Sequence, residues 1–153
     1  MPIKTSELKP EEKIQGEDLD ETNSLKAMLE KATDYVREFS WCPPIHSRFM
    51  AFGIGGVVGV FLLKFSKTIQ NSKDKEVWVV CGDLPSVYMV TEDLPDSKAV
   101  LYEYCNLMQD WIDAVLTNGN LEEVYPVEDP PTHGNAKALK KRINFIKTEL
   151  LKT

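Results

Sequence analysis

The longest apolar run of the chain, from Phe49 to Leu63, holds fifteen consecutive apolar residues, four of them glycines (FMAFGIGGVVGVFLLKF, residues 49–65). Three structures could explain such a run: a membrane-spanning helix, a glycine-rich loop that binds a phosphate group, or a buried β-strand. A helix needs about 20 residues to cross the hydrocarbon of a bilayer, so the run is too short for the first. The glycines at positions 53, 55, 56 and 59 miss the GxGxxG pattern by one residue, and a strand-like stretch follows where a dinucleotide site needs a helix.

A buried strand with glycines at its beginning is therefore the favoured interpretation. Alternation of side chains predicts one apolar face of Val57, Phe61, Leu63 and Phe65, and a second of Val58, Val60 and Leu62. A strand that is apolar on both faces is typical of the interior of a fold. Gly59 then marks either a bulge or a place where a bulky neighbour lies over the backbone.

The periodicity of the other segments predicts helices before and after a small sheet. Apolar residues recur at helical spacing from Asn23 to Phe39, and the prolines of WCPPIH (residues 41–46) end this helix. Strands are predicted over residues 76–82 and 86–91, because short polar connections between strand-like segments favour antiparallel hairpins. The tripeptide DLP (residues 83–85) is expected to turn the chain between them.

Two further helices are predicted in the last third of the chain. The first follows EDLPDS (residues 92–97), where Asp96 or Ser97 can cap its first turn, and Asn118-Gly119 supplies a left-handed stop. The second begins after Thr132 and has an apolar stripe with lysines outside it. The order α-β-β-β-α-α predicts an α+β fold, in which an antiparallel meander of three or more strands packs with about three helices.

Length and charge divide the chain further. We expect residues 1–20, which are polar, charged and aperiodic, to form a flexible leader, and residues 21–153 to form a single α+β domain. Residues 1–22 carry three Lys against seven Asp or Glu, whereas residues 135–153 carry six Lys or Arg against one Glu. The net charge of −6 argues against a nucleic-acid partner, because such a partner requires a basic surface.

The N-terminal sequence and the cysteines indicate a compartment. The first 21 residues contain no apolar segment of the kind found in a secretory signal. Cys42, Cys81 and Cys105 are odd in number and form no CxxC pair, which is typical of reduced thiols in a cytosol. We therefore expect a cytoplasmic protein that is not inserted in a membrane.

The segment WVVCGDLPSVY (residues 78–88) is the first candidate for a ligand-binding site. Asp83 stands at the end of a predicted strand, where side chains are often presented to ligands, but an Asp before a tight turn commonly bonds its own backbone. Pro85 and Tyr88 follow and could form the floor of a shallow pocket. Trp41 and His46 complete this candidate set, and all five residues are equally compatible with simple packing.

No catalytic or metal centre is predicted. Cys42 and His46 could pair as a thiolate and its base, but nucleophilic catalysis also needs an orienting acid and an oxyanion pocket, and a free cysteine is commonly a small buried apolar residue. His46 and His133 are 87 positions apart, and neither has a Cys or acidic residue at ligand spacing. We expect no metal and no cofactor.

Three segments resemble a family of small bacterial proteins of unknown function: GIGGVVGVFLLKF, EVWVVCGDLPSVYMV and AVLYEYCNLMQDWIDAVLTNG. The resemblance covers roughly Trp41 to Leu150. It implies a bacterial cytoplasmic domain, and it transfers neither an activity nor a site residue.

The function expected from these patterns is a non-enzymatic protein-interaction or regulatory domain that self-associates. Trp78 and Val80 leave the second predicted strand apolar on both faces, so any sheet face that the helices leave uncovered would form a homodimer surface. The alternative is a small enzyme or ligand-binding protein with a pocket near residues 78–88.

Overall fold

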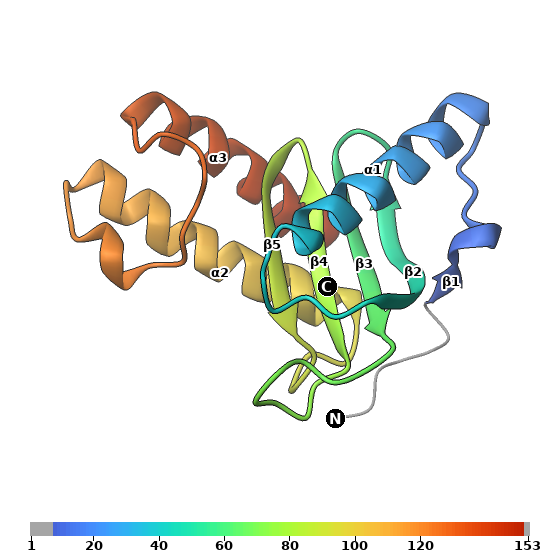
Figure 1. Ribbon diagram of the computed structural model, residues 1–153. Coiled ribbons are helices and arrows are strands. Elements are labelled where there is room, and N and C mark those ends of the chain that lie inside the picture. Colours follow the sequence, from blue (N-terminus) through green and yellow to red (C-terminus); the bar gives the residue numbers. More distant parts are fainter. Residues whose placement is uncertain (1–7, 152–153) are drawn as a thin grey trace. The chain divides into compact units, whose positions relative to one another are not determined.

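The computed structural model describes residues 8–151 and shows an α+β fold. Its described residues contain a five-stranded sheet, three α-helices and three short helical turns (Figure 1). The chain divides into two compact units at Val100 and Leu101. Each unit is described by itself below.

The first unit is built on an antiparallel meander in which every strand pairs with its neighbour in sequence. The α+β class and the antiparallel meander expected from the sequence are confirmed, with five strands in place of the three that were identified. The strands are β1 (Lys9–Pro10), β2 (Ile45–Ile54), β3 (Val58–Phe65), β4 (Glu76–Gly82) and β5 (Leu84–Val90).

The glycine-studded run forms a β-hairpin instead of the single strand that was predicted. β2 and β3 pair from Ile54–Val58 at the turn to Ile45–Phe65 at the open end, and residues 55–57 make the turn. Gly56 has φ of +76° there, a conformation that glycine adopts without steric cost. Val57 lies in this turn and is 39% exposed, so its predicted place on a buried face is wrong.

β3 is the centre of the sheet and is buried on both faces, as predicted. On one face, Phe61, Leu63 and Phe65 pack with the apolar side of helix α1 (Leu19–Arg37). The side chains of the other face are buried as well, so this is not an uncovered sheet face of the kind that was considered above as a homodimer surface. The buried side chains are those of Val58, Val60, Leu62, Trp78 and Val80. A Cβ atom at Gly59 would lie 2.6 Å from the Phe61 ring and 2.9 Å from Met28 Cε, so a bulky neighbour over the backbone, not a bulge, explains this glycine.

Helix α1 begins four residues earlier than the predicted Asn23 because Asp18 caps it. The Asp18 carboxylate accepts a hydrogen bond from the Glu21 N–H at 2.8 Å, which satisfies one of the unpaired donors of the first turn. Farther along, Lys31 Nζ donates to the Gly82 carbonyl oxygen at 2.8 Å, and the Cys81 thiol donates to the Met28 carbonyl oxygen. The helix is thus fixed to the sheet by polar contacts as well as by its apolar side.

Residues 9–20, assigned to the leader on sequence, carry β1, a 3₁₀ turn at Glu11–Lys13 and the start of α1. Ile14 is 3% exposed and belongs to the core cluster. Arg48 of β2 donates to Glu11 at 2.6 Å and to Glu30 of α1 at 2.7 Å. The pKa of the Glu11 carboxyl is lowered by the Arg48 hydrogen bond, and burial opposes that effect. The first seven residues of the predicted leader lie outside the described residues.

The β4–β5 connection is tighter than expected. Gly82 has φ of +141°, and the Asp83 N–H donates to the Val57 carbonyl oxygen at 2.9 Å. Leu84 and Pro85 already belong to β5, so the turn lies at Gly82-Asp83 and not along DLP.

The second unit contains most of α2 (Ser97–Leu116), a 3₁₀ turn η3 (Leu121–Glu123), α3 (His133–Phe145) and a π-helical turn η4 (Ile146–Leu150). Asp96 caps α2 by accepting from the Ala99 N–H at 2.9 Å, and Asn118 ends it with φ of 55°, as predicted. Thr132 caps α3. The Cys105 Sγ of α2 lies 3.9 Å from the Ile143 carbonyl oxygen of α3, so the two helices are in contact.

Candidate functional site

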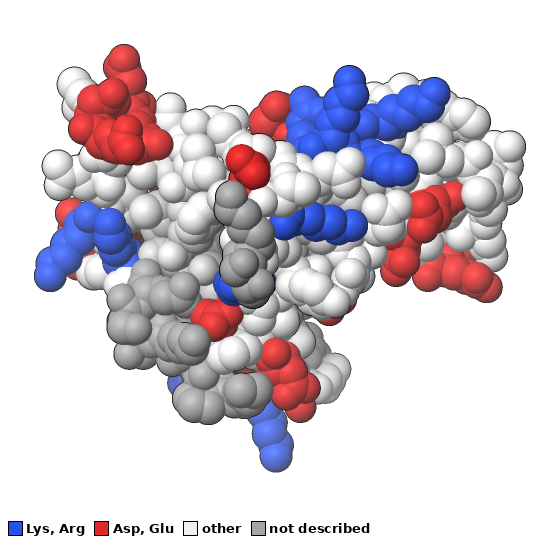
Figure 2. Space-filling model, turned by 180° about the vertical axis from the view of Figure 1, so that it is seen from behind, with Lys and Arg blue, Asp and Glu red and all other residues white. Residues whose placement is uncertain are grey.

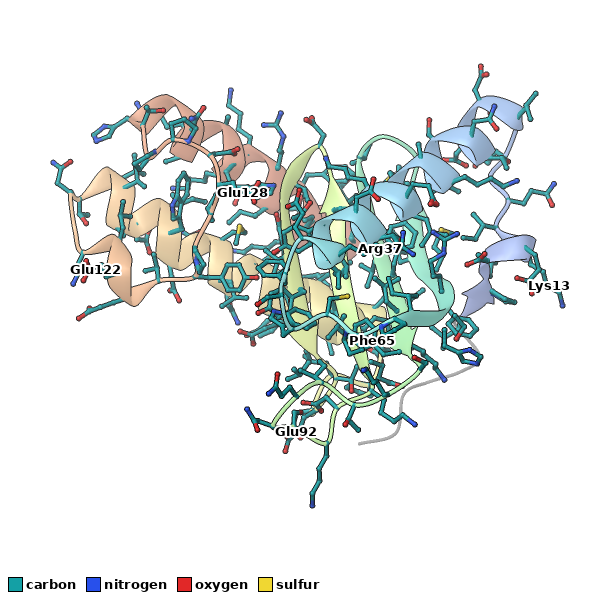
Figure 3. All side chains as sticks on the ribbon, in the orientation of Figure 1. Lys13, Arg37, Phe65, Glu92, Glu122 and Glu128 are labelled. Carbon is teal, nitrogen blue, oxygen red and sulfur yellow. The ribbon has the colours of Figure 1, made fainter. Side chains whose placement is uncertain are left out.

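A cluster of five aromatic side chains lies where α1 ends against the sheet. This aromatic patch consists of Tyr35, Phe39, Trp41, Phe65 and Tyr88. Its members come from the last turns of α1, the segment that follows, the end of β3 and the middle of β5. Figure 3 labels Arg37, at the end of α1, and Phe65.

Local sequence explains why the rings meet. After α1 ends at Arg37, the Phe39 N–H still donates to the Val36 carbonyl oxygen and the Cys42 N–H donates to the Phe39 carbonyl oxygen, both at 3.1 Å. These bonds coil the chain back on itself, and Pro43 and Pro44 prevent the helix from continuing. Phe39 and Trp41 therefore turn towards the sheet.

The rings form a connected network centred on Trp41 and Tyr88. Trp41 lies 4.8 Å from Tyr88 and 5.5 Å from Phe39 between ring centroids, the latter pair stacked at 23°. Phe39 and Tyr88 meet edge to face at 5.0 Å, and Tyr35 meets Phe39 edge to face at 5.3 Å. Such pairs contribute about 0.5–1.5 kcal/mol each beyond the area that they bury, so the network holds its rings in fixed positions.

Four of the five rings remain partly exposed. Phe65 is 3% exposed and joins the core, whereas Tyr35, Phe39, Trp41 and Tyr88 are half-buried. Val90 is 43% exposed and stands two residues after Tyr88, so alternation places it on the same face of β5. The result is a group of partly exposed aromatic rings that hold one another in place.

A groove of about 360 Å³ adjoins the aromatic patch. Residues 40–44 line one part of it and Lys67, Thr68 and Gln70 line the other. Trp41 belongs to both the groove and the patch. Within residues 8–151 the structure records no acceptor for the Trp41 indole N–H, and no buried side-chain donor is left without a partner, so this N–H is accessible from outside.

The structure brings two of the five predicted site residues together, Trp41 and Tyr88. Asp83 is exposed in the β4–β5 turn, and Pro85 lies next to this turn, where the register between β4 and β5 shifts. His46 is exposed on β2. The groove beside Trp41 is lined by none of the predicted residues apart from Trp41 itself.

Sequence reasoning assigned Tyr35 and Phe39 to the core stripe of the first helix and Phe65 to a face of the glycine-rich strand. The available signal was the spacing of Tyr35 and Phe39, four residues apart at the end of a helix and directly before Trp41. That spacing indicates adjacent rings, but the position of Tyr88 beside them depends on the register of the sheet.

The thiols are not activated. Partial burial raises the pKa of Cys42, an effect that the charge of Arg37 only partly opposes, and its thiol donates to the Pro43 carbonyl oxygen at 3.3 Å. Burial raises the pKa of Cys81 to about 12 and that of Cys105 to about 11. A thiol with a raised pKa carries little thiolate at neutral pH and is a poor nucleophile.

Comparison with protein-family models, with curated proteins and with solved structures finds no match to this chain. Along residues 8–151, no helix combines the length and the apolar character that crossing a bilayer requires. In the same residues, no three His, Cys, Asp or Glu side chains are grouped so that they could hold a metal ion.

Proposed function

We propose that this protein is a non-enzymatic protein-interaction domain that binds a partner protein through the aromatic patch and the adjoining groove. The observation that carries the proposal is the group of four half-buried aromatic rings, Tyr35, Phe39, Trp41 and Tyr88, held in contact at the surface. Tyrosine and tryptophan are enriched among the residues that contribute most to protein–protein binding.

Rigidity supports this assignment. A side chain that is already fixed before binding loses less conformational entropy in the complex than a mobile one. The rings of the patch are fixed by one another and by Phe65, which belongs to the core. The indole N–H of Trp41 supplies a donor for a partner's carbonyl oxygen at the edge of this apolar surface.

Self-association is a second part of the proposal. Large apolar side chains are exposed away from the patch as well, among them Tyr102 at 63%, Phe145 at 41% and Leu121 at 37%. All three lie in the second unit.

The three free thiols, two of which are buried, suit a reducing compartment. On that ground, and on the resemblance described above, we propose that the protein belongs to a bacterial cytoplasm.

The test is capture of a partner by variants of the patch. Trp41→Ala and Phe39→Ala each remove one half-buried ring, and Tyr102→Ala is the matched control, since it removes a more exposed aromatic ring outside the patch. We expect the same partner to be enriched by the wild-type chain and by Tyr102→Ala, and its affinity to fall at least tenfold in each patch variant, the loss expected when about 1.4 kcal/mol or more of binding energy is removed.

Circular dichroism and urea unfolding must first show that the patch variants are folded. If folded Trp41→Ala and Phe39→Ala chains bind the partner as tightly as the wild type, the patch is not the binding surface. A benzophenone amino acid at position 39 adds an independent readout, since it should cross-link to the partner whereas the same group at position 102 should not.

A further inference from the structure

Exposed lysines gather on the last helix of the second unit, and exposed carboxylates gather on the connection that precedes it. Figure 2 shows basic side chains gathered over α3 and acidic side chains on another part of the same unit. Figure 3 labels two of the acidic residues, Glu122 and Glu128, on the connection between α2 and α3.

The basic group follows the outer side of the last helix. The side facing the interior carries Ala136, Leu139, Ile143 and Ile146, each at most 2% exposed. The lysine face is an exposed side of the same helix and the turn that follows it, formed by Lys137, Lys140, Lys141 and Lys147. Ten residues separate its first and last members, which is about 15 Å along a helix.

The acidic group lies on and after η3. The acidic connection consists of Glu122, Glu123, Glu128 and Asp129, all exposed. Within residues 8–151, the structure records no ion pair for any of these four carboxylates or for the four ammonium groups of the lysine face. The two groups are equal in formal charge and opposite in sign, and neither forms an ion pair among the described residues.

An exposed apolar side chain accompanies each group. Leu121 directly precedes Glu122 and is 37% exposed, and Phe145 follows Lys141 by one helical turn and is 41% exposed. A surface that presented charge alone would interact with water and salt. A charged surface with an apolar group at its margin is typical of a protein contact, in which the apolar part supplies affinity and the charges fix partner and orientation.

We propose that the second unit binds a second copy of this chain, with the lysine face of one copy against the acidic connection of the other. In a two-fold dimer the same pair of surfaces meets twice, so both groups of each copy find their countercharge. This inference rests on the self-association part of the proposed function and names its surface. It does not involve the aromatic patch.

The choice of a second copy follows from the charges. A nucleic acid or an anionic membrane would neutralise the lysine face but would leave the acidic connection without a countercharge, because both carry negative charge. The apolar side of α3 is buried within the fold, so the helix has no free apolar side to insert into a bilayer. A second copy is the partner that satisfies both groups at once.

The experiment exchanges the charges on the two surfaces. One variant carries Lys137→Glu and Lys141→Glu, and the other carries Glu122→Lys and Glu123→Lys. Light scattering over a concentration series should give a dimer for the wild type and a dissociation constant at least tenfold weaker for each variant, as the substituted surface then carries no net charge and two of its four side chains repel the partner surface at both contacts. An equimolar mixture of the two variants should form a heterodimer, since one of its contacts keeps the wild-type charges and the substituted positions at the other contact carry opposite signs.

Salt and a matched variant complete the design. Raising NaCl from about 0.1 M to about 1 M shortens the Debye length from about 10 Å to about 3 Å and should weaken the wild-type dimer. Trp41→Ala should leave the dimer unchanged. If both charge variants still dimerise as tightly as the wild type, the surface assigned here is overturned but self-association is not. If the wild type is a monomer at every concentration, both the surface and self-association are overturned. Partner binding by the aromatic patch is unaffected by that result. Binding of a double-stranded oligonucleotide or of phosphatidylserine vesicles by the wild type, without dimerisation, would also overturn it.

Discussion

Replacing Gly82 with Ala should destabilise the protein far more than replacing Gly56 with Ala. Both glycines stand at tight turns of the sheet and both have positive φ, at +141° and +76°. They differ in the space around them. A Cβ atom at Gly82 would overlap the carbonyl oxygen of Val57, whereas a Cβ atom at Gly56 would meet nothing within 4 Å.

The expected magnitudes follow from this difference. A non-glycine residue at positive φ costs about 1–3 kcal/mol. At Gly82 the overlap with backbone, which cannot rotate away, adds the cost of overpacking, about 1–3 kcal/mol. The less flexible unfolded chain offsets about 0.4–1 kcal/mol at either site. We expect Gly82→Ala to lower the free energy of unfolding by about 2–5 kcal/mol and Gly56→Ala by about 1 kcal/mol.

Urea unfolding followed by circular dichroism measures both values under the same conditions. Equal losses for the two variants, or a larger loss for Gly56→Ala, would refute the claim that the close approach of Val57 is what requires glycine at position 82. A Gly82→Ala chain that unfolds without a cooperative transition would agree with the claim only if Gly56→Ala keeps a normal one.

Two further predictions concern titratable groups. Arg48 lowers the pKa of Glu11 below its ordinary value of 4.5, so their contact contributes fully to the free energy of unfolding above pH 4.5 and is lost as the pH falls through the lowered pKa. Glu11→Gln should therefore flatten this part of a curve of unfolding free energy measured from about pH 6 to pH 3. The change should be about 0.5 kcal/mol or less, because Glu11 is exposed to solvent. Iodoacetamide at about pH 8 should alkylate Cys42 in the folded protein and should spare Cys81 and Cys105, because burial raises the pKa of these two thiols to about 12 and about 11. Mass spectrometry measures which thiols are modified. Rapid modification of either buried thiol before unfolding would contradict the burial described here.

Much of the fold follows from local patterns. The strand at residues 76–82 has the predicted bounds, the left-handed stop is at Asn118 as predicted, and the last helix begins after Thr132 as predicted. The hairpin was not predicted, because its first strand (Ile45–Ile54) has no clear alternation and merges with the glycines into one apolar run. β1 is only two residues long and has no pattern of its own, since its pairing partners lie about forty positions away.

The candidate site shows the same division. Trp41 and Tyr88 were both singled out from the sequence, and the structure places them 4.8 Å apart. Asp83 and His46 were grouped with them because they are near in sequence to one or the other. In a strand, however, side chains one residue apart point to opposite faces and those five apart are about 17 Å apart, so nearness in sequence does not bring them together.

The amino-acid sequence alone determines which segments are apolar, where helices are capped or stopped, and that charge of one sign gathers on the last helix, because each of these depends on residues within a turn or two of one another. Which rings meet at Trp41, and which glycine lies against Val57, are decided only by the tertiary structure. Strand register sets those contacts, and register is fixed by pairing between residues far apart in the chain.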